Sequence, residues 1–105
     1  MSIEKRISQL LVDTLLKENL ISVNDGEETT VNKSQDRKQI LDALETTEAD
    51  TLFVYRPNGK RIGHFWLIWG NGRDLISDYG YVCNHAEKYM DEVVDLIDWT
   101  IGDAE

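Results

Sequence analysis

The stretch TLFVYRPNGKRIGHFWLIWGNGRDLISDYG, residues 51–80, decides the fold of this chain. It holds three apolar runs, at residues 52–55, 62–69 and 75–79, and each of the two segments between them contains Asn-Gly. Because Asn and Gly accept the positive φ angles of tight hairpins, the pattern predicts a three-stranded antiparallel meander. The middle run is apolar on both faces. It should therefore be an inner strand covered on both sides, or covered on one side and bound to a partner on the other.

The segment between residues 20 and 31 adds a second hairpin signal. Asp25-Gly26 separates two short β-prone runs, which predicts one clear strand at Thr29 to Val31 and a weaker one before the turn. The fold class expected from these patterns is α+β. It consists of an antiparallel β-meander of three to five strands, with the N-terminal and C-terminal helices packed on the sheet.

Three helices are predicted around these strands. Ser2 is the expected N-cap of a helix that runs to about residue 18, and Ser34 that of a helix over residues 35–44. Asn84 and Glu87 have the spacing of a capping box for a last helix, which ends at Gly102.

The first helix has an unusually wide apolar stripe. Val12 and Leu16 extend it beyond what one sheet face would cover. In one interpretation the helix packs between the sheet and another helix. In the other, Val12 and Leu16 form the face of a homodimer.

Length and composition indicate a single domain, residues 1–105, with an ordinary hydrophobic fraction of 41%. The single cysteine, Cys83, excludes an intramolecular disulfide and fits a reducing compartment. No secretory signal pattern is present, and the longest apolar run is far too short for a membrane helix. We therefore expect a cytoplasmic protein that makes no membrane contact.

Charge is the strongest functional signal. The chain has 20 acidic and 11 basic residues, a net charge of −9, and residues 87–105 alone hold seven carboxylates and one lysine. Such a field repels nucleic acid and attracts basic protein surfaces. One interpretation is a solvated surface. The other is a docking ridge for a basic host protein, with mimicry of nucleic acid as one variant, formed by Glu87, Asp91, Glu92, Asp95, Asp98 and Asp103.

Cys83, His85 and His64 are the only thiol and imidazoles in the chain. Their spacing matches no common zinc pattern, and a buried thiol and structural histidines are the simpler interpretation. We therefore expect no metal, no cofactor and no catalytic site.

Aromatic and basic residues alternate around the meander, a composition that occurs in single-strand nucleic-acid binders. The turns alternate between the two ends of the sheet, however, so the bases should split into two clusters. Together with the net charge, this favours core aromatics and no direct nucleic-acid binding. The residues are Phe65, Trp66, Trp69, Tyr79 and Tyr81, with Arg56, Lys60, Arg61 and Arg73 at the turns.

A resemblance rests on Asn24-Asp25-Gly26-Glu27-Glu28, on Ser34 with Asp36-Arg37, and on the strand end Leu67-Ile68-Trp69-Gly70-Asn71-Gly72. In these features the chain resembles small bacteriophage and prophage proteins of unknown function. The resemblance implies binding to a host protein and blocking it. The function expected is therefore an acidic protein-binding module. The alternatives are a homodimeric accessory protein and a small enzyme or metal-binding protein that uses Cys83, His85 and His64.

Overall fold

The computed structural model describes residues 2–102 and has the expected α+β architecture. Its elements follow in the order α1 (Ile3–Leu16), β1 (Leu20–Asn24), β2 (Thr29–Ser34), α2 (Arg37–Ala43), β3 (Ala49–Tyr55), β4 (Arg61–Ile68), a short 3-10 helix η1 (Gly72–Asp74), β5 (Ile76–Tyr81) and α3 (Asn84–Ile101).

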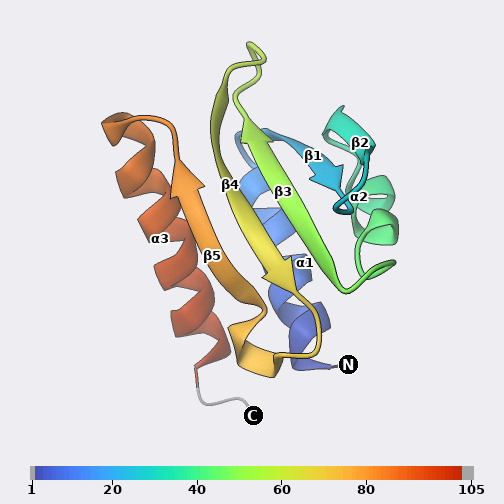
Figure 1. The fold of residues 1–105 in the computed structure, drawn as a ribbon. Helices are drawn as coiled ribbons and strands as arrows, with labels where there is room; N and C mark the ends of the chain where they lie inside the picture. Colours follow the sequence, from blue (N-terminus) through green and yellow to red (C-terminus); the bar gives the residue numbers. More distant parts are fainter. Residues whose placement is uncertain (1, 103–105) are drawn as a thin grey trace.

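The five strands form one antiparallel sheet in the order β2-β1-β3-β4-β5 (Figure 1). β4 pairs with β3 on one side and β5 on the other, as the apolar middle run predicted. In the turn between β3 and β4, the Arg56 N–H donates to the Lys60 carbonyl at 2.9 Å and Gly59 has a φ of +88°. Both strands of the Asp-Gly hairpin also form, and β2 and β5 are the edges of the sheet.

The helices cover only one face of the sheet. α1 lies behind the sheet in Figure 1, with α2 on one side of it and α3 on the other. On β4, Phe65 and Leu67 point into the core between sheet and helices and are fully buried, whereas Trp66 is 44% exposed. The expectation of cover on both faces is therefore not met within residues 2–102, since no described element covers the Trp66 side.

Packing of α1 between α2 and α3 contradicts the predicted dimer face. Val12 is fully buried, and Leu16 is half-buried against the same core. The wide apolar stripe is used inside the chain, because α2 supplies the second surface that α1 needs. The interpretation in which the helix packs between the sheet and another helix is therefore confirmed, and the predicted homodimer face of Val12 and Leu16 is wrong for Val12, which has no exposed surface.

Two of the three predicted helix caps are also wrong. Ser2 caps α1, but the side chain of Asp36 caps α2, because Ser34 is held in β2 by its pairing with Ile21. In α3, Cys83 occupies the cap position without a side-chain hydrogen bond, and Asn84 is already helical. Strand pairing next to a helix decides where that helix begins.

None of the helices in the described part of the chain is long and apolar enough to cross a membrane.

Candidate protein-binding surface

The inner face of α3 is apolar and points into the core. Ala86, Met90, Val93, Ile97 and Ile101 recur at helical spacing and are all buried. The acidic side chains of this helix must therefore lie on its flanks and on its outer face.

Two of the predicted partner-binding acids also lie against the edge strand of the sheet. Glu87 and Asp91 are half-buried on the flank of α3 that faces β5. The Tyr79 hydroxyl donates to Asp91 Oδ1 at 2.6 Å, and this hydrogen bond and burial raise the pKa of Tyr79 to about 12. Hydrogen bonding with Glu87 likewise raises the pKa of Tyr81. The hydrogen bond of Asp91 thus attaches α3 to the edge strand of the sheet.

The remaining acids are exposed. Glu92, Asp95 and Asp98 all lie in water, and none of the ion pairs among residues 2–102 involves an acid of α3. Asp103 lies outside the described residues. Among the described residues, the fully exposed part of the predicted ridge is these three carboxylates, which lie in the last three turns of the helix.

Sequence analysis missed two apolar residues on the same surface. Leu96 is 42% exposed and Trp99 is 82% exposed. Trp99 lies four residues after Asp95 and three after Leu96, so helical geometry places the three side chains next to one another. A helical wheel contains this signal, since residue 99 falls opposite the buried stripe. We call the set Glu92, Asp95, Leu96, Asp98 and Trp99 the outer face of α3.

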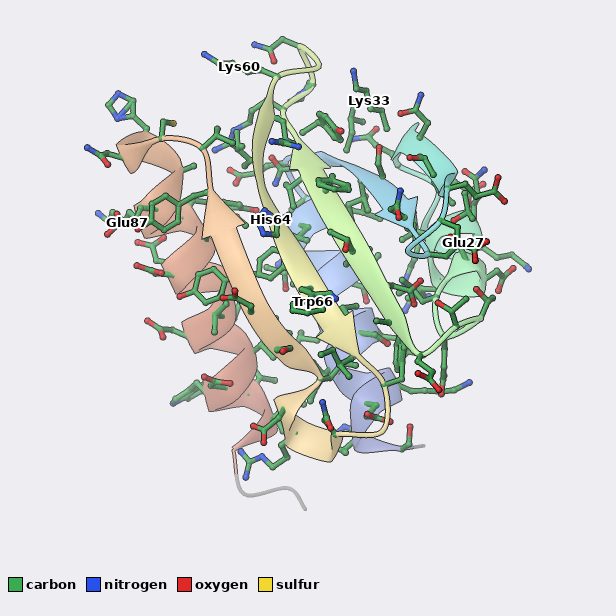
Figure 2. The ribbon with its side chains drawn as sticks, viewed as in Figure 1. Glu27, Lys33, Lys60, His64, Trp66 and Glu87 are labelled. Atoms are coloured by element: carbon green, nitrogen blue, oxygen red, sulfur yellow. The ribbon has the colours of Figure 1, made fainter. Side chains whose placement is uncertain are left out.

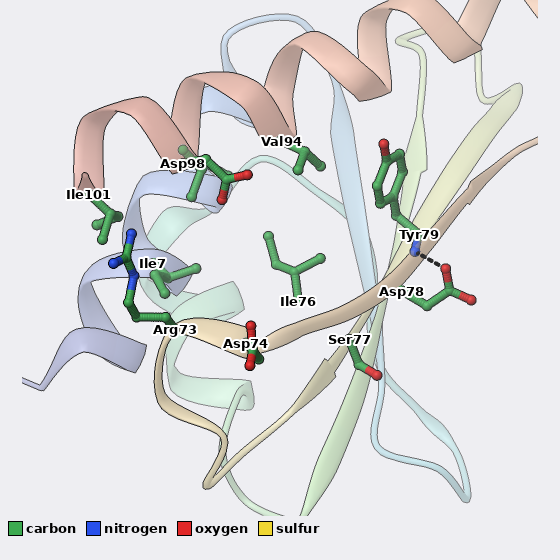
Figure 3. A pocket seen from close by; sticks show the side chains of 11 residues that line it. Ile7, Arg73, Asp74, Ile76, Ser77, Asp78, Tyr79, Val94, Asp98 and Ile101 are labelled. Carbon is green, nitrogen blue, oxygen red and sulfur yellow. Dashed lines mark hydrogen bonds between the residues drawn. The ribbon is translucent and has the colours of Figure 1, made fainter. Parts of the chain in front are cut away.

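A groove of about 260 Å³ runs between α3 and β5, beside this outer face (Figure 3). Asp74, Asp78 and Asp98 line it together with one cation, Arg73. Its apolar lining comes from Ile7, Ile76, Val94, Ile97 and Ile101. An apolar lining with acidic groups is suited to the aliphatic stem and charged head of a lysine or arginine side chain.

The structure does not bring the three residues considered for metal binding together in one metal-binding group within residues 2–102. Cys83, expected as a buried thiol, is exposed, and His85 is exposed in the first turn of α3. His64 lies on β4, with its ring 6.3 Å from that of Phe53. Within residues 2–102, no three His, Cys, Asp or Glu side chains are grouped closely enough to hold a metal ion.

Aromatic and basic side chains meet on the open face of the sheet (Figure 2). The core prediction holds for Phe65 and is wrong for Trp66 and Tyr81, which are both exposed. On this face, Lys33 Nζ lies 5.0 Å from the centre of the Tyr55 ring, and Arg61 Cζ lies 5.4 Å from that of Phe53. Sequence analysis missed these ring–cation pairs.

The missed signal is the alternation in β3, where Leu52 and Val54 are buried and the alternate residues Phe53 and Tyr55 face outward. Lys33 joins the group only because β2 lies in the same sheet, which no local pattern indicates.

Comparison with family models, curated proteins and solved structures finds no match to this chain, so its own surfaces carry the argument about function.

Proposed function

We propose that this protein is a protein-binding module that docks the outer face of α3 on a basic surface of a partner and so blocks or modulates that partner. The observation that carries the proposal is Trp99, an indole that is 82% exposed among three carboxylates without ion pairs. Burial of a large apolar side chain is favourable by about 1.5–3 kcal/mol. The exposed Trp99 therefore favours a bound state in which a partner covers it.

The outer face of α3 combines apolar residues that supply binding energy with charged residues that affect the rate and selectivity of association. Tryptophan is enriched among the residues that dominate interface energies, and here it has Leu96 beside it as a second apolar contact. Carboxylates around an apolar centre speed association with a cationic surface and select against acidic partners. The groove beside α3 offers a position for one lysine or arginine of the partner.

A basic groove that binds nucleic acid is the class of partner surface we favour. Such grooves combine cationic side chains with aromatic positions on which bases stack. The indole of Trp99, flanked by carboxylates, presents a ring and negative charges in an arrangement similar to the bases and phosphates that such a groove binds. The resemblance to phage proteins adds that the partner belongs to a bacterial host.

The test is quantitative capture from bacterial lysate, followed by affinity measurement with each purified partner. Trp99→Ala should weaken binding at least about tenfold, as loss of a hot-spot side chain does. Asp95→Lys with Asp98→Lys should weaken it further and remove most of its salt dependence.

Glu27→Lys with Glu28→Lys is the matched control, because it changes the net charge equally at a turn on the other side of the molecule (Figure 2). The control should bind like wild type. Equal recovery of every partner by all baits would refute the proposal.

A further inference from the structure

The open face of the sheet is an aromatic surface that no element of residues 2–102 covers. Phe53 and Tyr55 from β3 and Trp66 from β4 lie on it, with Lys33 and Arg61 against two of the rings. Lys60 and Lys33 lie near the same end of the sheet (Figure 2). We call this set the aromatic sheet face. Cations and aromatic rings gather on it although the chain has a net charge of −9.

A shallow hollow of about 340 Å³ lies within this face. Phe53 and Trp66 supply its aromatic lining, Arg61 and His64 its basic groups, and Asp78 one carboxylate. Asp78 Oδ1 accepts the N–H of Tyr79 at 2.8 Å, and its Oδ2 has no hydrogen-bond partner among residues 2–102. The hollow therefore offers aromatic contacts, a cation and a free hydrogen-bond acceptor in one place.

The outer face of α3 has the complementary set of groups. The Trp99 indole would supply a ring for the aromatic lining and an N–H donor for Asp78. Asp95, one turn before Trp99, would reach the guanidinium of Arg61. From this match in charge and hydrogen bonding, we infer that the outer face of α3 of one copy docks on the aromatic sheet face of a second copy.

The two-layer architecture of the fold also favours α3 of a second copy as the occupant of the aromatic sheet face. A helix laid on the open face completes a three-layer arrangement in which the sheet is covered on both sides. The two copies repel through their net charge, but at physiological salt this repulsion is screened beyond about 8 Å. Whether two copies associate therefore depends on the contacts between opposite charges at the interface.

Single-stranded nucleic acid is the competing occupant of the aromatic sheet face. The net charge of −9 opposes it, and Asp78 would repel a phosphate placed in the hollow. A second copy also brings carboxylates to this face, but unlike a phosphate it brings an indole N–H that can donate to Asp78 and an Asp95 that can pair with Arg61.

The contact joins two different surfaces, so it is heterologous and extends into rings or chains unless one surface is blocked. The inference rests on the α3 surface of the proposed function. It adds that self-association and partner binding exclude each other, because both occupy Trp99.

Sedimentation velocity on the full chain tests the inference. Wild type should associate between about 10 μM and 1 mM, the range of weak contacts. Trp99→Ala and Arg61→Glu should each stay monomeric, because each lacks one of the two surfaces. Mixed together, they should form a one-to-one complex, in which α3 of Arg61→Glu docks on the intact sheet of Trp99→Ala.

Asp95→Lys and Lys33→Glu provide a second pair of surface variants, and circular dichroism should show a native spectrum for all four. A monomeric wild type at every concentration, or no complex in either mixture, overturns the inference. So does association that Trp99→Ala leaves intact. Oligothymidylate that binds wild type and quenches tryptophan fluorescence, without any self-association, would identify nucleic acid as the occupant instead.

The outcome can be separated from that of the proposed function. Arg61→Glu should lose self-association and keep an external partner, whereas Trp99→Ala should lose both. Sedimentation of the purified chain needs no partner, so either idea can fail while the other stands.

Discussion

Removing the hydroxyl of Tyr79 should loosen α3 from the sheet by a measurable amount. Tyr79→Phe deletes the donor of the 2.6 Å hydrogen bond to Asp91 Oδ1 and keeps the ring that stacks on Phe65 at 5.9 Å. The substitution therefore removes one hydrogen bond between β5 and α3 and little packing.

The size of the effect follows from the pKa of Tyr79. The hydrogen bond to Asp91, with a smaller contribution from burial, raises this pKa from 10.0 to about 12. Two pKa units correspond to about 2.7 kcal/mol, but Tyr79 is partly exposed and water screens the pair. We therefore expect Tyr79→Phe to lower the free energy of unfolding by about 1 kcal/mol at neutral pH.

The same shift predicts how this contribution depends on pH. The folded-state pKa lies above the unfolded value, so the contribution is complete below pH 10 and is lost as the pH rises from 10 to about 12. The difference in stability between wild type and Tyr79→Phe should therefore shrink over that interval. Taking the difference cancels the titration of other groups that the two proteins share.

Urea unfolding followed by circular dichroism measures these free energies in a double-mutant cycle with Asp91→Ala. Each single variant and the double variant should lose about 1 kcal/mol, giving a coupling energy of about 1 kcal/mol. Asp95→Ala is the control, since Asp95 is an exposed acid of the same helix, and it should change stability by less than about 0.5 kcal/mol. Additive losses, or a stability difference that stays constant from pH 9 to 12, would refute the reasoning.

Three further outcomes follow from the packing. Gly63→Ala should lower the free energy of unfolding by about 2–3 kcal/mol in a thermal melt, because its Cβ would clash with the Gly80 carbonyl oxygen; an unchanged melting temperature would contradict this close approach. Glu4→Ala should speed amide hydrogen exchange at residues 70–72, whose three N–H groups all donate to Glu4 Oε2 at 2.7–3.2 Å, and exchange like wild type would show that the carboxylate does not hold this loop. Cys83 is exposed and should react with a thiol reagent in the folded state, and Cys83→Ser should leave partner binding and the melting temperature unchanged.

Much of the fold was present in local patterns. The two Asn-Gly segments predicted the meander, and the apolar run of residues 62–69 predicted an inner strand flanked by two others. Turn chemistry and side-chain alternation act between near neighbours, so they can be recognised without knowing the tertiary structure. The same holds for the concentration of acid in residues 87–105, which is a property of composition.

Such local patterns could not predict the structural roles of individual acidic residues. Asp91 and Asp95 occupy equivalent positions in the sequence spacing, yet Asp91 accepts the Tyr79 hydroxyl while Asp95 is exposed. Only the position of β5 beside α3 distinguishes them. Val12 was left between two interpretations for a similar reason, because an apolar stripe does not say whether a neighbouring helix or a second chain covers it.

The open face of the sheet was decided by tertiary structure alone. Residues of β4 are apolar on both faces, so alternation separates Phe65 from Trp66 without telling which one meets the helices. All three helices pack on the Phe65 side, and the sheet brings Lys33 of β2 and Arg61 of β4 to the opposite side. A surface formed from separate strands exists only once they are paired, because strand order and helix placement depend on contacts between residues far apart in the chain.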